Sequence, residues 1–152
     1  MLNGGLSWRY SGEVRSVLIC LVAALCAASC SNTPTAPVSA APYSQVDLLV
    51  GSGTEAAPGN TLSVNYTGWL YDPSQLDGKG LLFDTSEGAD PLKFILGAQQ
   101  VISGWDRGVV GMKVGGRRRL VSPPSLGYGG IRNHPIPAYS TLVFDIELVA
   151  IE

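Results

Sequence analysis

The clearest alternation of hydrophobic and polar positions runs through residues 61–71. One face of this segment carries Leu62, Val64, Tyr66, Gly68 and Leu70, and the other carries Ser63, Asn65, Thr67 and Trp69. A period of two residues predicts a β-strand with one buried face. Residues 141–151 alternate in the same way, but Val143 and Val149 add hydrophobic side chains to the second face. We therefore expect this second strand to be central in a sheet, with both faces covered.

Shorter strands are predicted where hydrophobic runs lie between turn residues. They cover residues 45–50, 81–86, 91–96 and 117–122. The intervening segments are rich in Gly, Pro, Asp and Asn, which favour turns. The last of these strands opens with the arginines Arg117, Arg118 and Arg119. We expect these arginines to form a solvated edge and not a nucleic-acid surface, because the net charge of the chain is −2.

Only one stretch has the spacing of an amphipathic helix. Its hydrophobic positions are Val101, Ile102, Trp105, Val109 and Met112. We expect a helix of about two to three turns, ended by Gly111 and by the Gly115–Gly116 pair. Gly104 is expected to leave room beside the indole ring of Trp105. An antiparallel sheet curled over one short helix is an α+β fold.

Residues 1–30 have the features of a signal peptide. Arg9 and Arg15 precede an apolar run that ends in small residues, "SVLICLVAALCAAS". The run is shorter than the ~20 apolar residues of a membrane span. The sequence "AASC" ends at Cys30 and resembles the box of bacterial lipoproteins, in which this cysteine is lipidated. Ordinary secretory cleavage near Ala28 or Ser29 and a retained anchor helix are the alternatives.

Residues 31–43 form the next segment, which we interpret as a flexible linker. They are rich in Ser, Thr, Ala and Pro and carry no charge. The folded domain is then expected over residues 44–152. All cysteines of the chain precede this domain, at Cys20, Cys26 and Cys30. The domain therefore holds no disulfide framework, no Cys-ligated metal site and no Cys nucleophile. Its single histidine, His134, lies in a loop-like run.

Aromatic side chains from separate segments are expected between the sheet and the helix. They are Tyr66, Phe83, Phe94, Trp105, Tyr128 and Phe144. From spacing alone, these side chains could form an ordinary hydrophobic core, because a core and an apolar binding pocket use the same residue types.

The order of motifs along the chain is similar to that of a known family. The stretches "VNYTGWL", "FDTS", "PLKFILG", "VISGWDRGVVGMKVGG", "PPSLGYG" and "IPAYSTLVFDIEL" resemble, in that order, the FK506-binding protein (FKBP) family of peptidyl-prolyl cis-trans isomerases. The resemblance covers essentially all of residues 44–152. It implies an antiparallel sheet of about five to six strands wrapped around one short helix, in agreement with the pattern of hydrophobic positions.

The resemblance also implies a substrate pocket and catalytic groups. The pocket would be lined by Tyr66, Phe83, Phe94, Val101, Ile102, Trp105, Tyr128 and Phe144. Trp105 would form its floor beneath the substrate proline ring. The Ile102 backbone N–H and the Tyr128 hydroxyl would bind substrate carbonyl groups. Asp84 would order the Tyr66 hydroxyl or bias the local electric field, with no role as a general base.

The implied activity is rotation about X–Pro bonds of proline-containing polypeptides, without a cofactor, a metal ion or a covalent step. Because of the targeting segment, we expect this activity to act on exported proteins outside the bacterial cytoplasm. The isomerase itself would be either a membrane-anchored lipoprotein or a periplasmic or secreted protein. Macrolide inhibitors of the FK506 type are implied as further ligands. The alternative is a catalytically weak chaperone or binding module that holds proline-containing segments in the same pocket.

Several positions depart from the family pattern. Leu92 stands where the family often has a second aromatic residue. Gly88 stands where many members carry an arginine, so we expect no ion pair at Asp84. Ser122 replaces an apolar residue, and residues 136–139 read "IPAY" in place of the common "IPP" run. We expect these changes to alter macrolide affinity and peptide preference more than activity.

Overall fold

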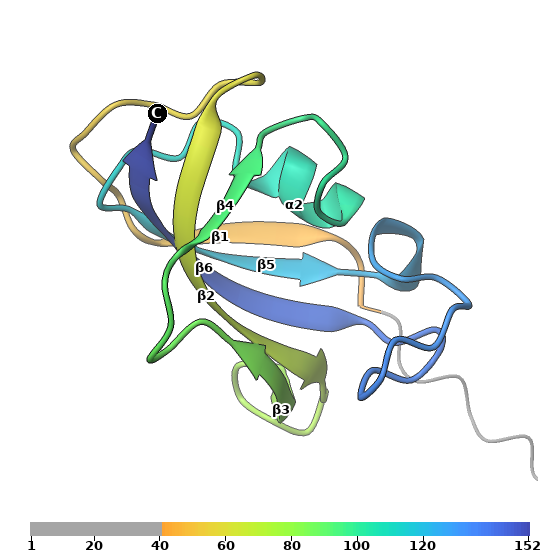
Figure 1. Ribbon diagram of the computed structural model, residues 1–152. Coiled ribbons are helices and arrows are strands. Elements are labelled where there is room, and N and C mark those ends of the chain that lie inside the picture. The colour runs from red at the N-terminus through yellow and green to blue at the C-terminus, as the bar shows by residue number, and fades with distance from the viewer. Residues whose placement is uncertain (1–40) are drawn as a thin grey trace, which may run out of the picture. The chain divides into compact units, whose positions relative to one another are not determined.

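The computed structural model describes residues 41–152, which form one antiparallel sheet and a short helix (Figure 1). In chain order the elements are β1 (Ser44–Leu49), β2 (Thr61–Tyr71), β3 (Lys79–Thr85), β4 (Leu92–Ile95), α2 (Ser103–Gly108), β5 (Arg117–Ser122), a 3-10 helix η1 (Pro124–Leu126) and β6 (Leu142–Ile151). The six strands follow the order β1-β5-β6-β2-β3, and β4 pairs with β2. The predicted α+β class is confirmed.

The two strands with the clearest alternation, β2 and β6, form the centre of the sheet. They pair from Leu62–Ile151 to Leu70–Leu142. The expected central position of β6 is confirmed, but its second face is covered only in part, because Val143 is buried whereas Glu147 and Val149 are exposed. On its other side, β2 pairs first with β4 and then with β3. One long strand thus supports both shorter strands near the helix.

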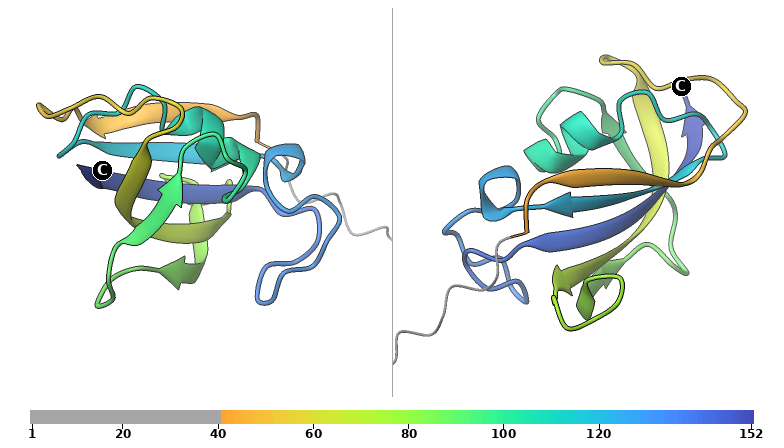
Figure 2. Two further views of the ribbon diagram at one scale, coloured as in Figure 1. Left: turned by 45° about the horizontal axis from the view of Figure 1, so that its top comes forward. Right: turned by 180° about the vertical axis from the view of Figure 1, so that it is seen from behind.

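The helix α2 lies against one face of the curved sheet, while β1 and β3 lie at the two ends of the sheet (Figure 2). It has six residues and is shorter than the sequence predicted. Val109 and Met112 are buried as expected, but they lie in the turn after the helix. The periodic spacing therefore came from a helix followed by a tight turn, both of which point side chains into the core.

Two features end α2 early. A Cβ atom on Gly108 would lie 2.5 Å from Leu120, so the helix packs directly onto β5 at this glycine. Arg118 donates hydrogen bonds to the carbonyl groups of Gly108 at 2.8 Å and Val110 at 3.0 Å. These bonds satisfy carbonyl groups that a longer helix would have bonded itself. Gly111 then turns the chain with a φ of +75°.

The prediction of a solvated arginine edge is wrong. The strand β5 lies inside the sheet, between β1 and β6. Arg118 is buried and makes an ion pair with Asp47 of β1, with Nε and Oδ1 2.5 Å apart. Arg119 makes an ion pair with Asp145 of β6 at 2.7 Å. Carboxylates on both neighbouring strands neutralise the two arginines, and only Arg117 is exposed.

Gly104 has a packing role that the sequence did not predict. A Cβ atom at this position would lie 2.2 Å from the Ser122 hydroxyl oxygen and 3.2 Å from the Leu126 carbonyl oxygen. Gly104 therefore allows α2 to approach β5 and η1 closely.

The predicted signal peptide, the Cys30 lipidation site and most of the linker lie outside the described residues. Tyr43, at the end of the linker, donates a hydrogen bond from its hydroxyl to the Gly104 carbonyl oxygen at 3.3 Å. Within residues 41–152, no helix combines the length and the apolar character needed to cross a membrane. His134 is exposed in the loop before β6, as its sequence context suggested.

Candidate active site

A small cavity of about 190 Å³ opens between α2, the ends of β2, β3 and β6, and the loop after η1. It is lined by Tyr66, Phe83, Asp84, Leu92, Gln100, Val101, Ile102, Trp105, Tyr128 and Phe144. These residues come from segments that are far apart in the sequence. Their convergence brings together every residue expected in the site except Phe94.

Aromatic rings form the floor and walls of the cavity. Trp105 is only 4% exposed, and its ring meets Tyr66 and Phe144 edge to face, with centroids 5.1 and 5.2 Å apart. Phe83 meets Phe144 in the same way at 5.7 Å. Edge-to-face contacts are favourable because the positive edge of one ring faces the negative face of another. The pocket is therefore preformed, since each ring is fixed by its neighbours.

Phe94 supports the pocket from behind. Its ring centroid lies 6.0 Å from that of Trp105, and its side chain is 3% exposed. It therefore packs beneath the indole and does not line the cavity. The sequence pattern placed Phe94 correctly on the buried side of β4, but a strand pattern does not distinguish a lining residue from a supporting one.

Besides the buried indole Nε1 of Trp105, two hydrogen-bond donors at the cavity have no acceptor in the described part of the chain. The backbone N–H of Ile102, the residue that caps α2, bonds to no group of residues 41–152. The hydroxyl of Tyr128 makes no hydrogen bond to those residues either. Both residues are partly exposed. Each donor is thus available to a carbonyl oxygen of a ligand in an otherwise apolar pocket.

Tyr66 and Asp84 form a polar pair at the rim. The Tyr66 hydroxyl donates to the Asp84 carboxylate at 2.6 Å, and the same carboxylate accepts the Thr85 backbone N–H at 2.9 Å. Burial, together with the hydrogen bond and the negative charge of Asp84, raises the pKa of Tyr66 to about 12. The hydroxyl therefore stays protonated at neutral pH. None of the ion pairs among residues 41–152 involves Asp84.

The segment that carries Val101 and Ile102 is held by the first turn of α2. The Asp106 carboxylate accepts the backbone N–H groups of Gly97 and Gln99, each at 3.0 Å. Hydrogen bonds to a carboxylate are stronger than neutral ones. This anchoring positions the Ile102 N–H at the cavity, although the sequence analysis assigned no role to Asp106.

Gln100 was not anticipated as a lining residue. Its side-chain oxygen accepts the Ile95 backbone N–H at 2.8 Å, so it joins the loop before α2 to the end of β4. A polar residue in a loop carries no periodic signal. Only the three-dimensional contact identifies it. Leu92, singled out earlier for replacing an aromatic residue, does line the cavity and is 39% exposed.

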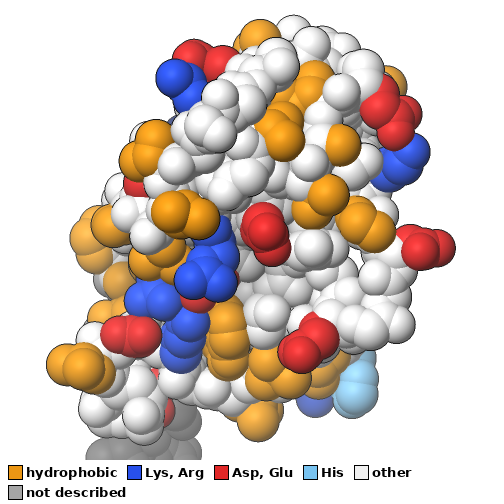
Figure 3. Space-filling view, turned by 90° about the vertical axis from the view of Figure 1, so that its left-hand side faces the viewer, with side chains coloured by type: hydrophobic (Ala, Val, Ile, Leu, Met, Phe, Trp, Pro, Cys, Tyr) orange, Lys and Arg blue, Asp and Glu red, His pale blue; other side chains and the backbone are white. Residues whose placement is uncertain are grey.

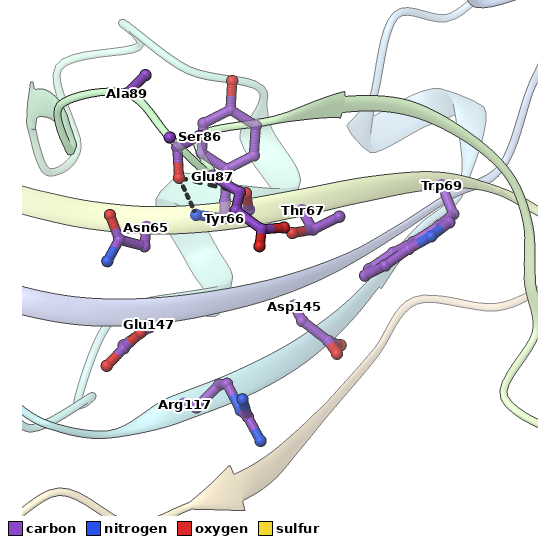
Figure 4. A pocket seen from close by; sticks show the side chains of 11 residues that line it. Asn65, Tyr66, Thr67, Trp69, Ser86, Glu87, Ala89, Arg117, Asp145 and Glu147 are labelled. Atoms are coloured by element: carbon purple, nitrogen blue, oxygen red, sulfur yellow. Dashed lines mark hydrogen bonds between the residues drawn. The ribbon is translucent and has the colours of Figure 1, made fainter.

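A larger hollow of about 590 Å³ lies on the other face of the sheet (Figure 4). Polar side chains of β2, β5 and β6 project into it, among them Asn65, Thr67, Arg117 and Glu147. Asp145 also lines this hollow and is shared by Lys79 and Arg119, each 2.7 Å away. Figure 3 shows a group of basic side chains on the face that it draws, with other basic side chains apart from this group. This hollow lacks the apolar walls of the smaller cavity, so the candidate site is the latter.

The lining of the cavity includes no Cys, Ser, His or Lys side chain. In residues 41–152, no cluster of His, Cys, Asp or Glu side chains could hold a metal ion. The cavity offers aromatic surface, two free donors and one carboxylate that is already hydrogen-bonded. Such a site can bind and orient an apolar group beside a carbonyl group, and it can favour one conformation of a bound chain over another.

Comparison with known proteins agrees with this geometry. The family model described as FKBP-type peptidyl-prolyl cis-trans isomerase matches residues 52–149. The chain is 43% identical over 105 residues to FK506-binding protein 1 of Aspergillus oryzae, a match that covers 66% of this chain and 90% of the relative. It is also 43% identical over 107 residues to the FK506-binding protein of Neisseria meningitidis serogroup B, which covers 69% of this chain and 92% of the relative.

Some relatives are much longer, and the match spans only 20–24% of their length. Among solved structures, the crystal structure of AtFKBP13 superposes with a TM-score of 0.61 at 36% identity, covering 76% of this chain and 98% of that chain. The family model and the similar relatives agree with the sheet, the helix and the aromatic cavity of this chain. The chain belongs to the FKBP-type peptidyl-prolyl cis-trans isomerases.

Proposed function

We propose that this isomerase acts on exported polypeptides and that it does so without covalent chemistry, in the cavity floored by Trp105. The single observation that carries the assignment of the site is the pairing of aromatic walls with two free donors, the Ile102 N–H and the Tyr128 hydroxyl. A prolyl ring is compact and apolar and lies directly beside two carbonyl groups. Its chemistry therefore matches this arrangement.

The reaction requires only that the pocket prefer the twisted amide to the planar one. Resonance gives the C–N bond double-bond character and creates a rotation barrier of ~18–20 kcal/mol. The planar amide is the more polar form, because resonance separates charge, and the twisted form loses this polarity. An apolar pocket therefore disfavours the planar form relative to the twisted one. Since only interactions that are stronger in the transition state accelerate a reaction, this preference is catalytic.

The donors add orientation to this effect. A carbonyl group bound by the Ile102 N–H fixes one side of the prolyl bond, and a second carbonyl group bound by the Tyr128 hydroxyl fixes the chain beyond it. With both ends oriented and the ring seated on Trp105, rotation is confined to the X–Pro bond. Preorganised donors of this kind cost no rearrangement during the reaction.

Asp84 contributes through Tyr66 and not by proton transfer. Its carboxylate already accepts hydrogen bonds from Tyr66 and Thr85, and Tyr66 stays protonated because its pKa is raised to about 12. The pair therefore holds the Tyr66 ring against the pocket and places a negative field at the rim. We assign Asp84, Ile102 and Tyr128 the catalytic roles, supported by this geometry.

A coupled cis–trans assay on a short X–Pro peptide tests the assignment. The full chain should accelerate isomerisation, and Tyr128→Phe should lower kcat/KM roughly 3- to 10-fold, the worth of one hydrogen bond. Tyr139→Phe is the matched control, because Tyr139 is 68% exposed and does not line the cavity. Equal turnover by Tyr128→Phe and the unaltered chain would remove the hydroxyl from the mechanism. Peptide binding without acceleration would favour the alternative of a chaperone or binding module.

The action on exported proteins rests on the sequence of residues 1–30. The apolar run that ends in "AASC" supports export and lipidation at Cys30. Labelling of cells with a lipid precursor tests this part, with Cys30→Ser as the control. Label that depends on Cys30 supports a membrane-anchored lipoprotein. Unlabelled protein outside the cytoplasm supports cleavage near Ala28 or Ser29 and a periplasmic or secreted protein. Protein that stays in the cytoplasm contradicts export.

Macrolides of the FK506 type are the second class of ligand that we propose for the cavity. The support is the aromatic pocket together with the names of the relatives, which are FK506-binding proteins. Leu92 offers less stacking area than an aromatic residue would. We therefore expect FK506 to compete with the peptide, with weaker binding than a relative that has an aromatic residue at this position. Competition is measured in the same isomerase assay.

A further inference from the structure

The strand β3 forms one end of the sheet and has an unpaired edge. It lies last in the order β1-β5-β6-β2-β3, so β2 is its only strand partner in the described residues (Figure 1). An edge strand presents backbone N–H and C=O groups that can pair with another extended chain. Proteins usually protect such an edge with charges, proline or a covering loop.

This edge lacks most of those protections. Leu81 and Leu82 are adjacent in β3 and are 68% and 50% exposed. Within β3, the only charged residue on the N-terminal side of these leucines is Lys79. Its ammonium group lies on the outer face of the sheet, 2.7 Å from Asp145 and 4.0 Å from the centre of a Trp69 ring, so it does not protect the edge. The β2–β3 loop folds toward the same outer face, because its Asp77 reaches Arg119 at 3.3 Å.

The same strand forms part of the prolyl cavity. Phe83 and Asp84 line the cavity, and Leu82 and Leu81 are the next residues along β3. An extended strand advances ~3.3 Å per residue. A polypeptide whose proline occupies the cavity therefore reaches this part of the edge within about two to four residues of that proline. Leu82 pairs with Trp69 and lies on the outer face, so a client strand paired along the edge would contact Leu81 on one face and Leu82 on the other.

We propose that the free edge of β3, with Leu81 and Leu82, is a docking site for an extended apolar segment of the client polypeptide that flanks the prolyl residue. Backbone pairing with the edge depends little on client sequence, and the leucines select apolar segments, which are exposed in unfolded chains. This docking site rests on the proposed function. It would let the enzyme recognise an unfolded polypeptide around the X–Pro bond and not only the X–Pro pair itself.

The geometry also limits the strength of the contact. The register between β2 and β3 shifts twice, between Gly68 and Trp69 and between Trp69 and Tyr71. Such irregularities bend and twist an edge, and therefore shorten the stretch along which a further strand can pair. Client binding along β3 is thus short and reversible, as an enzyme that must release its product requires.

The opposite edge, β1, provides the comparison. It also exposes hydrophobic side chains, with Leu49 58% exposed. No residue of β1 lines the prolyl cavity. A client that occupies the cavity therefore has no reason to contact β1. The two edges offer matched positions at which the same substitution can be made.

The test compares a short and a long substrate with the full chain. The double variant Leu81→Gln, Leu82→Gln removes the apolar surface without adding charge, and Leu49→Gln is its control. We expect kcat/KM on an X–Pro tetrapeptide to stay within about twofold for both variants. On a refolding protein limited by proline isomerisation, the double variant should lose about tenfold, because two leucines no longer bury apolar surface. Leu49→Gln should lose nothing.

Binding to a permanently unfolded, carboxymethylated protein gives a readout that does not need catalysis. The double variant should bind at least about fivefold more weakly than the unaltered chain. Unchanged binding and unchanged refolding activity of the double variant would overturn the docking site, as would an equal loss for Leu49→Gln. Absence of tetrapeptide activity in the unaltered chain contradicts the proposed catalysis instead, and the binding measurement still decides the role of β3.

Discussion

Replacing Trp105 by alanine should damage stability and activity together, since core and pocket share this side chain. The indole is 4% exposed and contacts the rings of Tyr66, Phe94 and Phe144 at centroid distances of 5.1, 6.0 and 5.2 Å. Truncation of a buried tryptophan costs about 3–5 kcal/mol, from lost burial and the cavity left behind. Domains of this size have only about 5–15 kcal/mol of stability.

Thermal unfolding followed by circular dichroism measures the first part of this prediction. A loss of 3–5 kcal/mol corresponds to a fall in Tm of roughly 12–20 °C for a domain of about 110 residues. Isomerase activity, measured well below the lowered Tm, tests the second part. The variant should lose most of its kcat/KM, because the proline ring no longer rests on an aromatic floor and the rims formed by Tyr66 and Phe144 are no longer fixed.

A core residue outside the pocket separates the two effects. Leu148 is 1% exposed and does not line the cavity, so Leu148→Ala should cost about 2–5 kcal/mol of stability and leave kcat/KM unchanged at a temperature where it is folded. If Trp105→Ala lowered stability but kept full kcat/KM, the cavity described above would not be the catalytic one. If activity fell with no change in Tm, the reasoning from burial would be wrong.

Two further predictions concern the frame of the sheet. Burial by itself raises the pKa of Asp145, but hydrogen bonds and charges of Arg119 and Lys79 outweigh it, so the pKa is lowered overall. Its stabilising contribution is therefore present above the unfolded value of ~3.9 and lost as the pH falls through the lower folded value. Acid unfolding monitored by fluorescence should show this loss of stability. The variant Asp145→Asn should lack this pH-dependent loss and should be roughly 1–3 kcal/mol less stable at neutral pH. An unchanged acid transition in the variant would contradict the assignment. Gly104→Ala should lower Tm by at least several degrees, because its Cβ would lie 2.2 Å from the Ser122 hydroxyl oxygen. A Tm equal to that of the unaltered chain would show that β5 can move away from the added methyl group without loss of stability.

The parts of the fold that were predicted well depend on local pattern. The strands β2 and β6 were recognised because alternation reflects which side of a strand faces the core, and the central position of β6 was predicted from its extra hydrophobic residues. The position of the helix followed from the spacing of Val101 and Trp105, although its length did not. Periodicity records which side chains are buried, and a buried turn after a helix continues the same pattern.

The errors arose where distant segments decide the outcome. Arg118 was assigned to solvent because arginine is usually exposed, whereas Asp47, far earlier in the chain, provides its partner. The close approach of Gly104 to Ser122 on β5 was not predicted either. Gln100 was not predicted as a lining residue, because it meets Tyr66 and Phe144 at the cavity, although its hydrogen bond to Ile95 is local. In each case the deciding contact joins residues that no local window contains together.

The sequence by itself determined the fold class, the central strands, the aromatic composition of the site and, through the order of its motifs, the family to expect. It did so because hydrophobic periodicity and turn chemistry act over a few residues and remain visible in one dimension. Only the tertiary structure decided that Trp105 lies beneath Tyr66 and Phe144 while Phe94 stays behind it, that the Ile102 and Tyr128 donors remain free, and that β3 continues from the cavity as an open edge. These properties depend on distances between groups of different elements, which the strand order of the sheet and the packing of α2 and the loops against it establish.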